Sequence, residues 1–177
     1  MAVIMAATYP DTFAAAGVAA GLEYRAATSE GAAWMAMSLG GPSPAPIARD
    51  IVERMGSRRR VVPMMVFHGK WDYVVKPING DQIARQWATV DDAILQESGA
   101  SLPGEPARVE QGRVPGGHGY TREIYQASDG RVLIEKVLVD GMSHAWPGGA
   151  QGESFTDPRG PDASRLLWEF FRSHRRK

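Results

Sequence analysis

Two loops carry side chains that could work together as an acid–base pair. Asp72 follows the apolar run Val61–Phe67, and His144 follows the strand-like segment Arg131–Val139. If both segments are parallel strands of one sheet, their carboxyl ends meet at the edge where functional side chains of α/β proteins gather. A carboxylate there can accept the Nδ1–H of an imidazole, which leaves Nε2 free as a general base. We therefore expect Asp72 and His144 to lie within hydrogen-bonding distance.

Strands and helices are expected to alternate around these loops, which indicates an α/β layered fold in a single domain, residues 1–177. The predicted strands are Phe13–Ala20, Val61–Phe67, Thr121–Ala127 and Arg131–Val139, the last two joined by the hairpin signal Ser128-Asp129-Gly130. The predicted helices are Met1–Thr8, Glu30–Met37, Ile47–Met55, Asn79–Val90 and Asp162–Ser173. Ser101–Gly119 is rich in Gly and Pro and predicts a surface excursion. His174, after the last helix, is expected to be a solvated tail residue.

Composition excludes several classes of function. Twenty basic and twenty acidic residues cancel, so no basic field favours nucleic acid or an anionic membrane. The absence of cysteine excludes disulfides, thiolate metal sites and a cysteine nucleophile. No apolar run reaches the roughly 18 residues of a membrane helix. The opening Met1–Ala7 lacks the basic residue that begins a signal peptide, so no export signal is predicted and the localisation stays open.

Four ordered segments together resemble one family of enzymes. These are M-A-A-T-Y-P-D-T-F-A-A-A-G-V-A-A-G (Met5–Gly21), H-G-K-W-D-Y-V-V-K-P-I-N-G (His68–Gly80), G-M-S-H-A-W-P-G-G (Gly141–Gly149) and S-F-T-D-P-R-G-P-D-A-S (Ser154–Ser164). They are similar to the polyhydroxybutyrate depolymerase-like esterases, α/β-hydrolases related to feruloyl and acetylxylan esterases. The resemblance extends over nearly the whole chain.

The resemblance implies a serine-type carboxylic ester hydrolase with a triad in the order Ser, Asp, His. By position, Asp72 matches the triad acid and His144 the triad base. Trp71 and Trp146 flank these two residues, and we expect them either to line an apolar cleft or only to pack the loops. The substrate would be a polyester, feruloyl or acetyl ester, with no cofactor and no metal. The implied fold is the C-terminal portion of an α/β-hydrolase, its last parallel strands with their flanking helices. Members of the family are usually secreted.

The nucleophile of this family sits in a G-x-S-x-G elbow on a strand-to-helix turn. The 177 residues contain no such motif, and its expected place is a few residues before Met1. The near match Ala36-Met37-Ser38-Leu39-Gly40 is unfavourable, because Ala- and Met-rich residues precede Ser38 and three prolines after it, Pro42, Pro44 and Pro46, are expected to prevent a helix. We expect this chain alone to be inactive.

Other readings stay open beside the triad. His68 is expected to brace the acid loop by hydrogen bonds, and His118 to be a rim residue or to have no role. A metal site formed by His68, Asp72 and His144 lacks the H-x-x-x-H spacing of zinc sites. The rival function is a noncatalytic hydrolase-fold fragment or interaction module. An unpaired edge at Phe13–Ala20 predicts self-association in either case.

Overall fold

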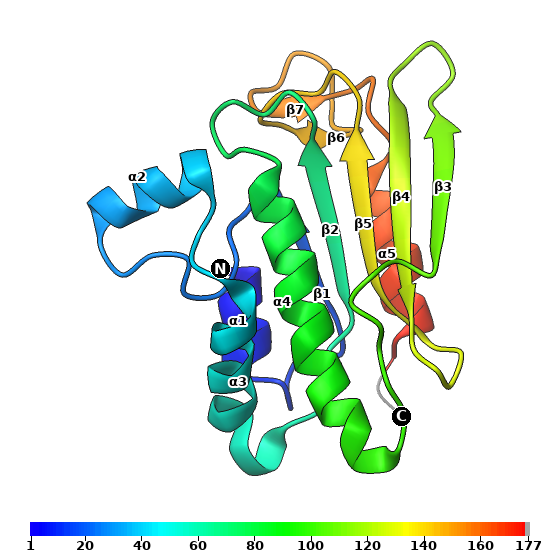
Figure 1. The fold of residues 1–177 in the computed structure, drawn as a ribbon. Coiled ribbons are helices and arrows are strands. Elements are labelled where there is room, and N and C mark those ends of the chain that lie inside the picture. Colours follow the sequence, from blue (N-terminus) through cyan, green and yellow to red (C-terminus); the bar gives the residue numbers. More distant parts are fainter. Residues whose placement is uncertain (176–177) are drawn as a thin grey trace.

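A five-stranded sheet forms the centre of the structure, a computed structural model that describes residues 1–175 (Figure 1). The helices are α1 (Ala2–Thr8), α2 (Glu30–Leu39), α3 (Pro44–Met55), α4 (Ile78–Leu95) and α5 (Ala163–Ser173), with short 3₁₀ turns η1 (Gly56–Arg58) and η2 (Gln96–Ser98). The sheet strands are β1 (Ala16–Ala19), β2 (Met64–Gly69), β3 (Arg108–Arg113), β4 (Gly119–Gln126) and β5 (Val132–Val139). A two-stranded ribbon follows, β6 (Trp146–Pro147) with β7 (Thr156–Asp157).

The sheet is mixed, with the order β1-β2-β5-β4-β3. β1, β2 and β5 are parallel, whereas β4 and β3 extend the sheet as an antiparallel hairpin pair. The parallel strands that the resemblance implies are thus β1, β2 and β5, and the predicted hairpin of Thr121–Ala127 with Arg131–Val139 is confirmed as the antiparallel pair β4 and β5. The pairing of β2 with β5 aligns Gly69 with Val139, so both strands end side by side. The two loops that carry Asp72 and His144 consequently begin at neighbouring points of one edge.

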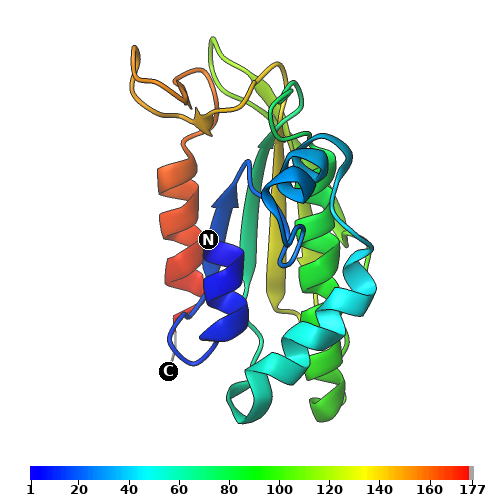
Figure 2. The same cartoon turned by 90° about the vertical axis from the view of Figure 1, so that its left-hand side faces the viewer.

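Helices cover both faces of the sheet, which explains why β2 is apolar without alternation. All six residues of β2 are buried. Met64 and Val66 face the cluster formed with α1, α3 and α4, while Met65 and Phe67 face the cluster that includes α5. Figure 2 shows α5 on one side of the sheet and α3 with α4 on the other. Because neither face of such a strand contacts solvent, its sequence shows no alternation of apolar and polar residues.

One strand was missed, and one predicted helix begins three residues earlier than expected. The Gly- and Pro-rich excursion Ser101–Gly119 contains the edge strand β3, whose residues are mostly exposed and therefore carry little apolar pattern. Helix α3 begins at Pro44, not Ile47, because a proline in the first helical turn lacks only an N–H that would have no helical partner. The other predicted elements were correct in type and shifted at their ends, whereas the short ribbon of β6 with β7 was not predicted.

The last helix packs as its amphipathic pattern predicts, but the residue after it does not. Phe170 is buried in the cluster of α5, and Leu166, Leu167 and Phe171 pack partly buried against it. His174 was predicted to be solvated and is instead half-buried, with Nε2 2.7 Å from Val132 O and Nδ1 2.8 Å from Phe170 O. Its ring centroid lies 4.3 Å from that of Phe170, so His174 packs the C-terminal end of α5 against the start of β5.

Candidate active site

Asp72 is fixed by a tight loop after β2. Its side chain is buried, with 1% of the residue exposed, and Oδ1 accepts the backbone N–H groups of Val74 (3.0 Å) and Val75 (2.8 Å). These two bonds satisfy one carboxylate oxygen from within its own loop and stabilise its negative charge. The second oxygen, Oδ2, remains available to the neighbouring loop.

The loop of His144 lies directly against the loop of Asp72. Lys70 donates its N–H to Val139 O (2.9 Å), and Trp71 donates its N–H to Met142 O (3.0 Å). Gly69 permits this approach, since a Cβ there would lie 2.2 Å from Met142 O. Any side chain at position 69 would push the two loops apart.

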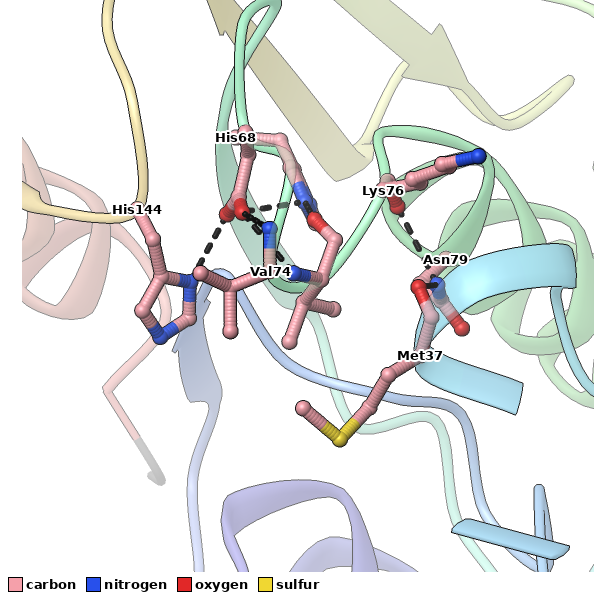
Figure 3. A network of polar contacts seen from close by, with 8 residues as sticks. Met37, His68, Val74, Lys76, Asn79 and His144 are labelled. Atoms are coloured by element: carbon pink, nitrogen blue, oxygen red, sulfur yellow. Dashed lines mark hydrogen bonds and ion pairs between the residues drawn. The ribbon is translucent and has the colours of Figure 1, made fainter. Parts of the chain in front are cut away.

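The predicted contact between the two side chains is present. His144 Nδ1 lies 2.8 Å from Asp72 Oδ2 (Figure 3). Because a carboxylate only accepts hydrogen bonds, Nδ1 carries a proton, so in the neutral ring the lone pair is on Nε2. The His144 side chain is 28% exposed, and no hydrogen bond to Nε2 is seen among residues 1–175. This arrangement presents a basic nitrogen to solvent with an oriented ring behind it.

His68 supports the acid loop from below, as predicted. Its Nε2 donates to Val75 O at 2.7 Å and lies 3.6 Å from Asp72 Oδ2. Burial lowers the pKa of His68, against smaller opposing effects of the Val75 hydrogen bond and the Asp72 charge. A neutral ring therefore packs under the carboxylate. Gly80 makes room for it, because a Cβ there would lie 2.8 Å from His68 Nδ1.

A pocket of about 200 Å³ opens beside His144. It is lined by Ala19, Ala20, His144, Ala145, Trp146 and Phe155. Of the two tryptophans expected at a cleft, Trp146 lines this pocket, whereas Trp71 does not and is 60% exposed. The volume is below that of sites for drug-sized ligands, so the pocket suits one small group.

Phe155 is a pocket residue that sequence reasoning missed. It is 75% exposed and has a φ of 58°, which is costly for a residue with a Cβ. Its ring stands edge-on to the His144 ring at a centroid distance of 6.2 Å. In the sequence this residue falls in a segment that reads only as the approach to the last helix. The sequence does not predict the positive φ of Phe155, and this backbone conformation accompanies the placement of its ring beside His144.

The one near match to a nucleophile elbow is not on a strand-to-helix turn. Ser38 lies within α2, one residue before its last. The prolines after Ser38 do not prevent a helix as predicted, since α3 contains Pro44 and Pro46. Ser38 is nonetheless an unfavourable nucleophile. The residues before it form a helix, whereas a nucleophile elbow follows a strand, and the helix ends just after it at Gly40, which has a φ of 88°.

Residues 1–175 contain neither a cluster of metal-ligating side chains nor a helix able to span a membrane. No group of three or more His, Asp or Glu side chains there is placed to hold a metal ion. None of the helices in that range combines the length and apolarity needed to cross a bilayer.

His118, whose role the sequence left open, lies away from the pocket. Its Nε2 is 2.9 Å from Asp157 Oδ2, and both side chains are nearly buried. It thus forms a second His–Asp pair, on the strand β7 side of the His144 loop.

Comparison with known proteins identifies the family to which this chain is similar. The family described as esterase PHB depolymerase matches residues 1–111, which include Asp72 but not His144. The chain is 29% identical to poly(3-hydroxyalkanoate) depolymerase C from Paucimonas lemoignei over 150 residues. That alignment covers 83% of this chain and 33% of the depolymerase. The chain therefore spans about a third of the length of this relative.

The fold also matches a solved structure, an acetyl xylan esterase from Aspergillus awamori. The TM-score is 0.57 at 24% sequence identity, and the match covers 81% of this chain and 49% of that one. At this identity the likeness concerns the fold, an α/β sheet with flanking helices.

Proposed function

The chain belongs to the esterase PHB depolymerase family, and we propose that it supplies the acid and the base of a serine-type carboxylic ester hydrolase. Asp72 is the acid and His144 the base. One observation supports this most directly: a buried carboxylate oxygen lies 2.8 Å from Nδ1 of His144, a residue that also lines a pocket.

In the proposed reaction, His144 Nε2 takes the proton from a serine hydroxyl as the oxygen attacks the ester carbonyl. The Asp72 carboxylate stabilises the imidazolium that forms and keeps the ring in the productive tautomer. His144 then returns the proton to the departing alcohol, which leaves an acyl-enzyme. In the second half, His144 activates water by the same proton transfer, and the acid is released.

We further propose that the serine belongs to a G-x-S-x-G elbow preceding α1 in a longer polypeptide. The support is that family members carry the order Ser, Asp, His and that Ser38 lies in a helix. Trp146, at the pocket, is proposed to contact the group next to the ester carbonyl. Trp71, being exposed, is proposed to contact parts of the substrate outside the pocket. The substrate class is an ester, with polyester, feruloyl and acetyl esters as candidates.

The test compares the 177-residue protein with a polypeptide extended upstream through a G-x-S-x-G elbow and the strands before it. The short protein should neither hydrolyse p-nitrophenyl butyrate nor react with a fluorophosphonate probe. The extended polypeptide should do both, because labelling requires a serine beside a competent base. His144→Ala should abolish both in the extended polypeptide, while His174→Ala, which removes a histidine at the opposite end of the sheet, should not. Stoichiometric labelling of the short protein at any serine would refute the assignment.

The rival function is a noncatalytic module that acts through its surface. Helix α2 favours this reading, because Trp34, Met35 and Leu39 are each more than 60% exposed. Exposed apolar side chains gathered on one helix are typical of interaction surfaces. An extended polypeptide that folds, carries the elbow and still fails to hydrolyse esters would favour this alternative.

A further inference from the structure

His118 contacts both ends of the loop that carries His144. Its ring lies immediately before β4 and is 12% exposed as a side chain. At the start of the loop the ring packs against Gly141, where an added Cβ would lie 3.4 Å from His118 Cε1 and Nδ1. At the end of the loop, His118 Nε2 is 2.9 Å from Asp157 Oδ2.

Asp157 transmits this contact to the residues next to His144. In the β6–β7 ribbon, Gly148 donates its N–H to Asp157 O (2.8 Å), and Trp146 donates its N–H to Phe155 O (2.7 Å). These bonds fix the chain two and four residues after His144. The position of Asp157 therefore sets the direction in which the chain leaves His144.

A second tie strengthens the same junction. His118 donates its backbone N–H to Arg159 O (2.9 Å), and Arg159 donates its own N–H to Asp157 Oδ1 (3.0 Å). Gly117 allows this approach, because a Cβ there would lie 2.3 Å from Arg159 O. The turn before β4 and the strand β7 are thus joined by both backbone and side chain.

The charge of Asp157 suits its part in this junction. Burial opposes ionisation, but the hydrogen bonds from Arg159 N–H and His118 outweigh it and lower the pKa of Asp157. A carboxylate accepts from both partners, so His118 Nε2 carries the proton. Charge-assisted bonds of this kind are about twice as strong as neutral ones.

We propose that His118 is a positioning residue for His144. By joining Gly141 to Asp157, it closes the 141–157 loop and holds the His144 ring in hydrogen-bonding position against Asp72. Its catalytic meaning rests on the proposed function, whereas the geometric claim does not. His118 itself touches neither Asp72 nor the pocket beside His144.

The test follows the His144 Nδ1–H proton by ¹⁵N-resolved NMR of the 177-residue protein. In the unsubstituted protein this proton should exchange slowly with solvent, because it is held by buried Asp72. His118→Ala should accelerate its exchange at least about tenfold, as expected for loss of one hydrogen bond to a charged group. His118→Gln should restore slow exchange, because its amide can donate to Asp157.

Two further substitutions separate positioning from general stability. Asp157→Ala should reproduce the effect of His118→Ala, and the double variant should be no faster than either single one. If His118→Ala does not fold, Asp157→Ala alone still tests the proposal, because the His118 ring is retained in that variant. His174→Ala removes a half-buried histidine whose two ring nitrogens lie 2.8 and 2.7 Å from backbone oxygens, and it should leave the exchange of the His144 proton unchanged.

Exchange within twofold of the unsubstituted protein in both His118→Ala and Asp157→Ala would overturn the proposal. So would an equal acceleration in His174→Ala. These outcomes are independent of activity. An extended polypeptide without esterase activity refutes the proposed function alone, and an active one with unchanged His144 exchange in the variants refutes the positioning role alone.

Discussion

Replacing Asp72 by Asn changes one atom at the centre of the site. The amide has two possible orientations. Placing its NH₂ at Oδ1 would oppose the N–H groups of Val74 and Val75, which lie 3.0 and 2.8 Å away. The NH₂ should therefore take the place of Oδ2 and face His144 Nδ1. Two donors cannot share that bond, so His144 must move its proton to Nε2.

The expected effects follow from this exchange of donors. With Nε2 protonated, His144 can no longer accept the serine proton, and the rate of an extended, active polypeptide should fall by about 10⁴-fold. The lost bond to a charged group is worth roughly 1.5–3 kcal/mol, which relief from burying the charge partly offsets. A net loss of about 1–2 kcal/mol should lower Tm by roughly 2–8 °C in a domain of this size.

The tautomer is the decisive measurement. Long-range ¹H–¹⁵N NMR of the 177-residue protein should show the His144 proton on Nδ1 in the unsubstituted form and on Nε2 in Asp72→Asn. Asp140→Asn is the matched control, since Asp140 is a half-exposed aspartate near the same loop, paired with Lys70 at 2.7 Å. Such surface pairs contribute about 0–1 kcal/mol, so the control should leave tautomer and rate unchanged. If Asp72→Asn retains the Nδ1–H tautomer and loses less than tenfold in rate, the orienting role of Asp72 is wrong.

Two further predictions concern stability and assembly. Burial raises the pKa of Glu23 to about 7, and only 4% of the residue is exposed, so folded protein keeps a proton that the unfolded chain releases. The contribution of Glu23 to stability should therefore fall by roughly 3 kcal/mol as pH rises from about 4.5 to 7. Burial also raises the pKa of Asp91, so Glu23→Gln should reduce the slope in urea titrations across that range without abolishing it; an unchanged slope would contradict the assignment to Glu23. Strand β1 lies at an edge of the sheet with its outer side unpaired in residues 1–175, so the protein should self-associate in sedimentation experiments. A monodisperse monomer across a wide concentration range would exclude this.

Much of the fold could be predicted because the pattern that encodes it is local. The six buried residues of β2 form an unbroken apolar run, and α5 shows its inward face at helical spacing. The hairpin between β4 and β5 follows from Ser128-Asp129-Gly130. Strand β3 was missed because an exposed edge strand needs no apolar face, and its pairing with β4 supplies the bonds that hold it.

The candidate site divides in the same way. The sequence by itself determined which residues could act as acid and base. Asp72 and His144 each follow a recognisable strand, and each lies in a segment that resembles the family. The sequence also led to the prediction that the two side chains are in contact, but only on the assumption that their strands end side by side; the structure confirms a distance of 2.8 Å between His144 Nδ1 and Asp72 Oδ2. That contact depends on β5 pairing with β2, while two intervening strands are placed beyond it, and strand order is set by burial of whole faces and not by any local pattern.

Tertiary structure alone decided the surroundings of His144. The strained backbone of Phe155 and the packing of His118 between Gly141 and Asp157 both depend on how one loop docks on another. Neither feature produces a periodic pattern in the sequence, because each involves a single side chain in an irregular segment of backbone. Local sequence fixes conformational preference through sterics and hydrophobic spacing, whereas these contacts arise only after the sheet has brought distant loops to the same edge.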